Sequence, residues 1–306
     1  MAVFETRLRE VLRSKIEFVQ LIEQDLVEAG GKRARPRLVF LAAGALGGVP
    51  FATELALSTE LLHSATLLHD DLVDDAETRR GQLAAFRKYG NAVSVLAGDY
   101  LLSRLLWLLG QMGRLELVAM FAEAARQLSE AEVLQFQVAA LADYSDENYQ
   151  NIITGKTAAL FQLCCEGAAV LADAEPEYRR ALARFGLCYG QAFQMRDDYL
   201  DLMGTQERLG KPVGGDLREG KVTLITLRLL QRHREVVEPV LARRAAQEGD
   251  IEQMRTLARD SGVAGQIVKS IQQAAESAVA ALAPFPQTPY KAALEALALA
   301  ETERIH

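Results

Sequence analysis

Apolar residues recur at the three- to four-residue spacing of an α-helix along nearly the whole chain. The first segment shows the pattern at Phe4, Leu8, Leu12, Ile16 and Val19. Half of the 306 residues are apolar, and alanine and leucine, which favour helices, are abundant. No segment alternates polar and apolar residues over the length of a strand, so we predict no β-strands. The sequence therefore predicts an all-α protein with a large buried core.

Helix ends are marked by glycine, proline and polar residues. The first helix is expected to end at Gly30 and Gly31, and Pro36 suits the first turn of the second, which runs to about Leu46. Ser145 is expected to cap the helix that follows it. Other helices are expected at about 52–74, 92–109, 116–140, 146–171 and 176–203, with a polar loop at 76–90, a glycine-rich loop at 204–220, and an alanine-rich helical region after them, broken near Pro284, Pro286 and Pro289. Because no linker rich in Pro, Gly or Ser divides the chain, we predict one domain, residues 1–306.

The charge pattern argues against a nucleic-acid partner. The formal net charge is −7, whereas nucleic-acid binding needs clustered Lys and Arg. Where basic residues do cluster in this chain, they stand beside aspartates. This arrangement favours a small anionic ligand held together with metal, and we expect no nucleic-acid partner.

Cysteine usage and hydropathy favour a cytoplasmic protein. Cys164, Cys165 and Cys188 form no C-x-x-C pair, and an odd number suits no closed disulfide framework, so we expect reduced core residues. Charges occur from the first residues onward, without the apolar core of a signal peptide. No stretch reaches 18 uncharged apolar residues, so we expect no stable membrane insertion, although an apolar product leaves transient membrane contact open.

One acidic motif, D-D-x-x-D, occurs twice, each time near the end of an expected helix. Its six aspartates are Asp70, Asp71 and Asp74 in the first copy, and Asp197, Asp198 and Asp201 in the second. Residues four apart share a helix face, so the outer aspartates of each copy point the same way. Such crowded carboxylates repel one another, and Mg²⁺ commonly binds one or two carboxylates together with substrate phosphates and water. If the two motifs face each other, they hold metal on both sides of a diphosphate.

Four basic clusters complement these acids. They are GGKRARP at 30–36, Arg79-Arg80-Gly81, Lys156-Thr157, and the loop from Gly210-Lys211 through Asp216 to Gly220-Lys221. Arginine binds phosphate through a planar fork and lysine as a point charge. The ordered set predicts a site for more than one phosphate group.

In the order, spacing and content of these motifs, the chain resembles the trans-prenyl diphosphate synthases. The resemblance covers residues 28 to 230 and is carried by GGKRARPRL, ELLHSATLLHDDLVDDAETRRG, AGDYLL, ITGKTAALF, GQAFQMRDDYLDLMG and LGKPVGGDLREGKVTL. It implies a bundle of long helices around a central apolar cavity. It also implies Mg²⁺, three ions with substrate bound, and a homodimer.

The resemblance implies roles for individual residues. The six aspartates are the expected metal ligands. The allylic diphosphate is expected to bind Arg79, Lys156, Lys211 and Lys221, and isopentenyl diphosphate is expected to bind Lys32, Arg35, His63 and Arg80. Thr157 and Gln194 stand where the family stabilises the developing allylic cation, and Asp216 stands behind them as a supporting group. The implied reaction ionises the allylic diphosphate, joins the cation to the double bond of isopentenyl diphosphate, and ends with loss of a proton to the departed diphosphate.

Small residues before the first motif bear on product length. Ala65 and Thr66 lie five and four residues before Asp70, more than one helical turn deeper along the helix. In the family a bulky aromatic at this depth stops elongation early. We therefore expect a product longer than farnesyl, with the tunnel closed deeper, at a residue such as Trp107 or Phe136.

Three other functions compete with this interpretation. A terpene cyclase would use one aspartate-rich motif and a different second metal site, and would not need the isopentenyl diphosphate residues. A regulatory subunit of a heteromeric synthase would tend to lose the acidic motifs, and both are intact in this chain. A helical scaffold protein predicts no affinity for metal or diphosphate.

Overall fold

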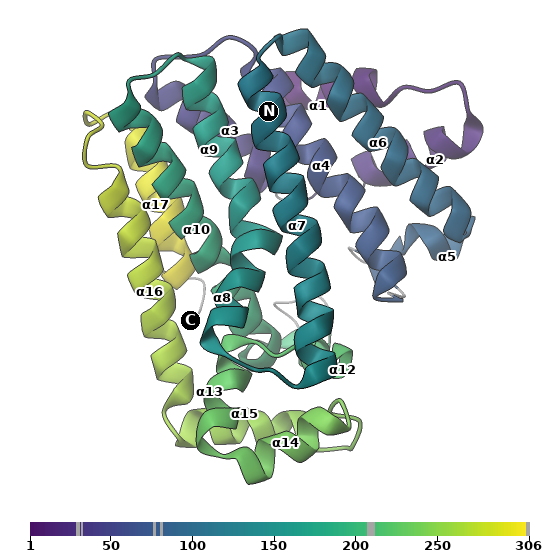
Figure 1. Cartoon of the computed structure of the whole chain (residues 1–306), viewed down its shortest axis with the longest axis vertical. Coiled ribbons are helices and arrows are strands. Elements are labelled where there is room, and N and C mark those ends of the chain that lie inside the picture. Colours follow the sequence, from purple (N-terminus) through teal and green to yellow (C-terminus); the bar gives the residue numbers. More distant parts are fainter. Residues whose placement is uncertain (29–30, 32, 76–77, 80–81, 207–211, 304–306) are drawn as a thin grey trace. The chain divides into compact units, whose positions relative to one another are not determined.

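The computed structural model describes residues 1–28, 31, 33–75, 78–79, 82–206 and 212–303 (Figure 1). Its helices are α1 (Ala2–Leu12), α2 (Glu17–Glu28), α3 (Ala34–Ala45), α4 (Ala52–Val73), α5 (Ala85–Tyr89), α6 (Asn91–Met112), α7 (Leu115–Leu141), α8 (Asp146–Ile153), the π-helix η1 (Thr154–Ala158), α9 (Ala159–Leu171), α10 (Pro176–Met203), α12 (Gly215–Glu219), α13 (Leu224–Arg232), α14 (Arg234–Ala242), α15 (Asp250–Asp260), α16 (Val263–Ala281) and α17 (Pro289–Glu303). The all-α prediction is confirmed.

The prediction of no strands is wrong at one place. Within the expected loop, β1 (Thr78–Arg79) and β2 (Gln82–Leu83) form a two-stranded antiparallel ladder. The loop also contains the short helix α5. Strands of two residues are too short to show an alternating pattern, so periodicity could not reveal them.

The expected first helix is broken into α1 and α2. Between them, the Ser14 hydroxyl accepts a hydrogen bond from the Ile16 backbone N–H at 3.1 Å. The Gln20 side chain donates to the Ser14 carbonyl at 2.7 Å. These local bonds give the backbone an alternative to helical hydrogen bonds, so the helix breaks at Ser14 although the apolar spacing continues.

The described chain forms two compact units, the first from residues 1–125 and 163–179 and the second from 126–162 and 180–306. In the first unit, α4 packs along α3 and α6. Every residue of α4 from Leu55 to Leu62 is buried. A helix that is buried around its circumference is a core element, so α4 presents its later residues from a rigid support.

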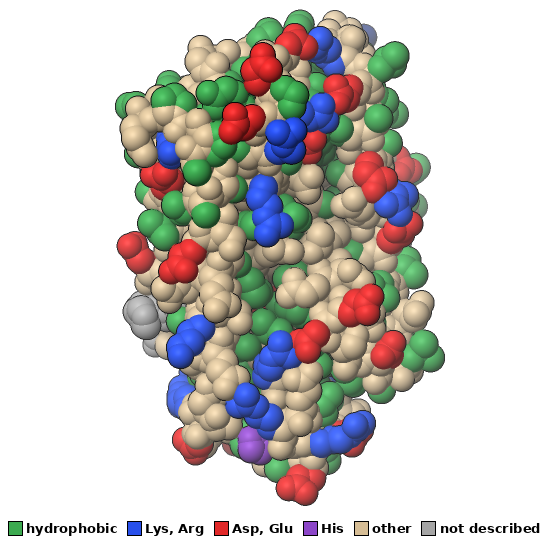
Figure 2. All heavy atoms as spheres, turned by 60° about the vertical axis from the view of Figure 1, so that its left-hand side comes forward, with side chains coloured by type: hydrophobic (Ala, Val, Ile, Leu, Met, Phe, Trp, Pro, Cys, Tyr) green, Lys and Arg blue, Asp and Glu red, His purple; other side chains and the backbone are tan. Residues whose placement is uncertain are grey.

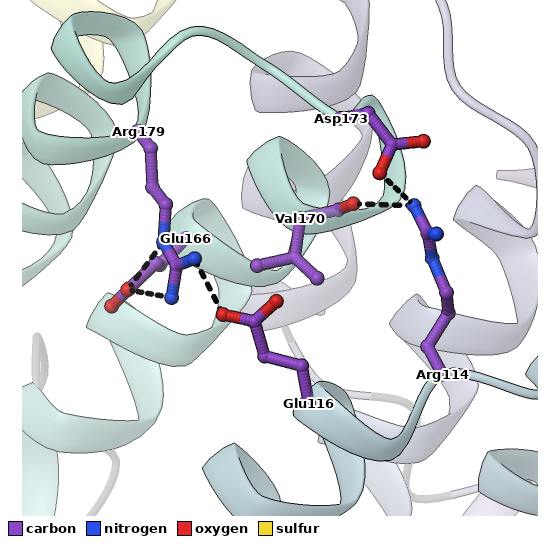
Figure 3. Close-up of polar contacts among 6 residues, drawn as sticks. All are labelled: Arg114, Glu116, Glu166, Val170, Asp173 and Arg179. Carbon is purple, nitrogen blue, oxygen red and sulfur yellow. Dashed lines mark hydrogen bonds and ion pairs between the residues drawn. The ribbon is translucent and has the colours of Figure 1, made fainter.

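Two arginines tie the start of α7 to α9 and α10 in the first unit (Figure 3). Arg179 contacts Glu166 at 3.0 Å and Glu116 at 2.5 Å. Arg114 donates to the Val170 carbonyl at 2.9 Å and contacts the Asp173 carboxylate at 2.5 Å. These contacts fix the turn between α9 and α10.

In the second unit, α10 lies in backbone contact with η1 and the start of α9. A Cβ on Gly190 would lie 2.5 Å from Ala158 Cα, and one on Gly186 would lie 2.5 Å from the Phe161 carbonyl oxygen. These glycines, inside a helix where each costs about 1 kcal/mol relative to alanine, are therefore explained by packing. The same unit contains an apolar core built largely from α13, α15 and α16.

The three cysteines are buried and none forms a disulfide, which confirms that part of the prediction. Burial raises the pKa of the Cys164 thiol to about 12. These thiols are therefore protonated core groups.

Candidate active site

The second acidic motif lies on the last turns of α10, in the second unit. Asp198 and Asp201 are buried, with 7% and 4% of their surface exposed, and the Asp197 side chain is 45% exposed. All three positions are helical, so Asp197 and Asp201 share a face as the sequence predicted.

A cavity of about 120 Å³ opens beside this motif. Four residues singled out from the sequence line it together with Asp216, namely Lys156, Gln194, Asp198 and Lys221. The lining also includes apolar side chains from α7 and α8, such as Val138 and Ile153. The structure thus brings basic, acidic and amide groups from distant parts of the sequence around one space.

A chain of hydrogen bonds connects the side chains at this cavity. The Thr157 hydroxyl donates to Gln194 Oε1 at 2.6 Å. Gln194 Nε2 donates to Asp198 Oδ1 at 2.7 Å, and the Tyr149 hydroxyl donates to Asp198 Oδ2 at 2.8 Å. Both carboxylate oxygens of Asp198 therefore have a neutral donor.

The electrostatics of Asp198 favour a bound cation. The pKa of its carboxyl is raised to about 6, and burial is the largest cause. The hydrogen bonds from Gln194 and Tyr149 act to lower this pKa, and the neighbouring charges of Asp197 and Asp201 act to raise it. A positive charge beside these carboxylates would offset both the free-energy cost of burying the Asp198 charge and the repulsion among the three carboxylates.

Lys156 and Thr157 lie in η1, a single π-helical turn inside an otherwise α-helical run. Lys156 Nζ contacts Glu132 of α7 at 2.5 Å, and the Glu132 side chain is only 16% exposed. A Cβ on Gly155 would lie 2.6 Å from the Gln127 carbonyl oxygen, so glycine permits this close approach. Such π turns are frequent at functional sites because they shift the register of the side chains.

The loop after the second motif is attached to it. The Asp216 backbone N–H donates to Asp201 Oδ2 at 2.9 Å, and the Gly214 N–H donates to the Asp201 carbonyl at 2.7 Å. Lys221 contacts Glu219 at 2.7 Å. Asp201 thereby supports the loop that carries Asp216 and Lys221, while Lys211 lies outside the described residues.

The first motif lies at the end of α4, in the first unit. Asp71 is buried, Asp70 and Asp74 are partly buried, and the Asp74 N–H donates to the Asp70 carbonyl at 2.8 Å. That bond keeps the helical turn intact, so Asp70 and Asp74 share a face as predicted. The facing of the two motifs stays a prediction.

Of the residues expected to bind isopentenyl diphosphate, His63 and Arg35 are partly buried in the first unit. Lys32 and Arg80 lie outside the described residues, and Arg79 is part of β1. Arg33, between Lys32 and Arg35, is buried and paired with Glu60 at 2.6 Å. Its guanidinium is therefore held by contacts within the first unit.

The residues expected to set product length divide into two groups. Ala65 is fully buried in α4, and Thr66 is partly buried with its hydroxyl donating to the His63 carbonyl at 2.9 Å. Trp107 and Phe136, proposed as a tunnel floor, are 42% and 47% exposed. Such exposure does not fit a floor enclosed by this chain alone.

The donor set fits a hard divalent cation. Among the described residues, no three His, Cys, Asp or Glu side chains converge as a complete metal site. Carboxylates from each motif would instead supply part of a coordination sphere, with phosphate oxygens and water completing it, which is the usual pattern for Mg²⁺.

Sequence reasoning missed several groups at this site. Tyr149 and Glu132 contact predicted residues from other helices. Arg196, buried beside the second motif, pairs with the fully buried Glu301 of α17 and donates to Asp197 at 3.1 Å. A tyrosine or glutamate inside a helix carries no local signal of such a contact, although the position of Arg196 next to Asp197 was a hint.

Comparison with known proteins gives one consistent result. The family profile described as "Polyprenyl synthetase" matches residues 17–258. The chain is 38% identical to an all-trans-nonaprenyl-diphosphate synthase (geranyl-diphosphate specific) of Rhodobacter capsulatus, over 99% of this chain and 94% of that protein. It is 36% identical to an octaprenyl diphosphate synthase of Escherichia coli (strain K12), over 99% and 95% of the two chains.

Solved structures agree in fold. A polyprenyl synthase from Caulobacter crescentus CB15, complexed with calcium and isoprenyl diphosphate, matches with a TM-score of 0.93 at 36% identity, over 100% of this chain and 95% of that one. A decaprenyl diphosphate synthase from Rhodobacter capsulatus matches with a TM-score of 0.93 at 34% identity, over 100% and 96%. The chain belongs to the polyprenyl synthetase family, and its assignment from sequence to the medium- and long-chain trans-prenyl diphosphate synthases is confirmed.

Proposed function

We propose that this chain condenses isopentenyl diphosphate with an allylic prenyl diphosphate, releasing diphosphate and giving an all-trans polyprenyl diphosphate longer than farnesyl. The observation that carries the proposal is the cavity at which Lys156, Gln194, Asp198 and Lys221 meet. The names of the relatives, an octaprenyl and a nonaprenyl diphosphate synthase, support the long product. The family match crosses both compact units, which supports one functional domain.

Each group at the cavity has a chemical task in this reaction. Lys156 and Lys221, with Arg79 and Lys211, bind the allylic diphosphate. The oxygens of Thr157 and Gln194, which lie 2.6 Å apart, present negative partial charge to the developing allylic cation. Lys32, Arg35, His63 and Arg80 hold isopentenyl diphosphate so that its double bond attacks the cation.

The six aspartates would hold Mg²⁺, three ions with substrate bound. The metal supplies positive charge that neutralises the leaving diphosphate. After the new carbon–carbon bond forms, a proton is lost and the double bond is restored. The departed diphosphate accepts that proton.

Turnover tests the proposal directly. The purified chain is mixed with isopentenyl diphosphate and geranyl diphosphate, and released diphosphate is followed with Mg²⁺ or with EDTA. We expect release only with Mg²⁺ and only with both substrates. Release from geranyl diphosphate alone would instead indicate a terpene cyclase, and activity that needs an added partner would indicate a regulatory subunit.

Ala65→Phe is expected to shorten the product. Ala65 is buried five residues before Asp70, about 7.5 Å deeper along α4, so a phenyl ring there narrows the path of the growing chain. Ala65→Val, a smaller enlargement, should give an intermediate length. Product sizing by mass spectrometry measures the series. Unchanged product length in a folded Ala65→Phe protein would remove Ala65 from the account.

A homodimer is part of the proposal. Four apolar side chains on α6 are exposed to solvent, namely Val95 (37%), Leu96 (65%), Leu106 (63%) and Trp107 (42%). Exposed apolar side chains gathered on one helix are typical of an interface. Light scattering on the protein as it elutes from a size-exclusion column should give twice the 33.6 kDa chain mass.

We also propose a cytoplasmic protein without stable membrane insertion or nucleic-acid binding. Among the described residues, α6 alone is long and apolar enough to cross a membrane, although 39% of that stretch is buried. It contains Asp99 and Arg104, and Arg104 donates to the Val11 carbonyl at 2.7 Å, so α6 is packed on α1. On the face drawn in Figure 2, acidic and basic side chains are interspersed, so this face differs from the clustered Lys and Arg surface that nucleic-acid binding needs.

A further inference from the structure

Tyr149 is the one member of the hydrogen-bond chain at the cavity that no motif assigns. It lies in α8 and is 4% exposed, and its hydroxyl donates to Asp198 Oδ2 at 2.8 Å. An ionised carboxylate oxygen can only accept, so the phenol is the donor in this bond. Tyr149 thus contacts the second acidic motif directly.

The position of Tyr149 is set by its own helix. Ser145 caps α8 by accepting from the Asn148 N–H at 3.1 Å, and the Tyr149 N–H donates to the Ser145 carbonyl at 3.1 Å. The start of the helix is therefore fixed. The phenol is held by backbone contacts that do not involve α10.

Among the described residues, polar contacts join α8 and η1 to α10. Besides the bond from Tyr149, Gln191 donates to the Thr154 hydroxyl at 3.1 Å and Thr157 donates to Gln194 at 2.6 Å. Of these three, only the contact from Tyr149 ends on an aspartate of the motif. Its effect on the motif is therefore separable from the packing of the two helices.

The two donors on Asp198 determine how its carboxylate lies. Gln194 holds Oδ1 and Tyr149 holds Oδ2, so rotation of the carboxylate would break both bonds. Each oxygen accepts one hydrogen bond and retains a lone pair for a cation. Without the phenol, Gln194 alone would hold the group.

We propose that Tyr149 is a positioning residue, which orients the Asp198 carboxylate for binding of the metal–diphosphate group. The inference rests on the proposed function, because it assigns Tyr149 to the same site. The alternative is a buried phenol that merely satisfies its own hydrogen bond and contributes only stability.

Tyr149→Phe in the full chain separates the two roles. The ring remains and one donor is lost. Partners of metal-binding groups typically contribute about 10- to 100-fold to metal affinity or activity. We expect kcat/KM to fall by about that factor and the Mg²⁺ concentration for half-maximal rate to rise, with the KM for isopentenyl diphosphate unchanged within about twofold.

Binding gives a readout that needs no turnover. Mn²⁺ is titrated in the presence of inorganic diphosphate and followed by electron paramagnetic resonance, and Tyr149→Phe should raise the Kd about tenfold. The matched control is Tyr100→Phe, which removes a phenol that donates to the Leu12 carbonyl at 3.1 Å in the first unit. The control should leave the Kd unchanged. A lower Tm for Tyr149→Phe with wild-type metal dependence and Mn²⁺ affinity would overturn the proposal.

A double-mutant cycle with Asp198→Asn keeps the proposal testable if Tyr149→Phe also loses stability. If Tyr149 acts through Asp198, its removal should change the Mn²⁺–diphosphate Kd by less than about twofold in the Asp198→Asn background. Additive losses would overturn the proposal. If the wild-type chain binds Mn²⁺ and diphosphate but makes no product, the proposed function fails while the cycle still decides the role of Tyr149.

Discussion

Asp198→Asn is expected to lower kcat/KM by about 10³-fold, which corresponds to about 4 kcal/mol of lost transition-state stabilisation. Asparagine keeps the shape of the side chain but removes the charge. The carboxylate is buried beside Asp197 and Asp201, and its pKa is raised to about 6. A bound cation would offset both the cost of burying this charge and its repulsion by the two neighbours. Loss of that charge weakens the neutralisation of the leaving diphosphate.

The matched control for this variant is Asp173→Asn. Asp173 is an aspartate of the first unit whose side chain is 79% exposed and pairs with Arg114 (Figure 3). Exposed ion pairs contribute at most about 1 kcal/mol to stability, so activity should stay near that of the wild type. Steady-state kinetics at several Mg²⁺ concentrations measures both variants. Near wild-type kcat/KM for Asp198→Asn would exclude Asp198 from metal binding.

Gly190→Ala is expected to destabilise the protein by about 3 kcal/mol. Its new methyl group would lie 2.5 Å from Ala158 Cα and 2.9 Å from Ala158 Cβ, so α10 and η1 must separate. Because backbone atoms meet there, no side-chain rotation relieves the overlap. The same shift moves Thr157 away from Gln194, so activity should fall as well.

Thermal unfolding measures this effect against Gly265→Ala. Gly265 lies in α16, and a Cβ there meets nothing within 4 Å. Alanine in an open helical position should be neutral or stabilise by up to about 1 kcal/mol. We expect a Tm several degrees lower for Gly190→Ala only. Equal Tm values for the two variants would contradict the backbone contact between α10 and η1.

The sequence predicted the helices well wherever a boundary residue had one clear physical role. Pro176 begins α10 and Ser145 caps α8, as expected. Serine between α1 and α2 was ambiguous, because the same hydroxyl is found both in helices and in turns. The ladder of β1 and β2 depends on backbone pairing, which leaves no residue pattern at that length.

The site was predictable where chemistry repeats within one helix, and less so where it depends on tertiary contacts. Aspartates four residues apart can be recognised from the sequence alone, because that spacing places them on one helix face. The contact of Lys156 with Glu132 and that of Asp198 with Tyr149 join side chains far apart along the chain. The π-helical turn at η1 also depends on packing, since Gly155 meets the backbone of α7. Such features require the folded arrangement.

Product sizing of the wild-type chain tests the proposed activity and the proposed product length together. The protein is incubated with Mg²⁺, isopentenyl diphosphate and, separately, dimethylallyl, geranyl, farnesyl and geranylgeranyl diphosphates, and the hydrolysed products are measured by mass spectrometry. We expect products longer than farnesyl. Products that stop at farnesyl would contradict the argument from Ala65, and no product from any primer would contradict the proposed activity itself.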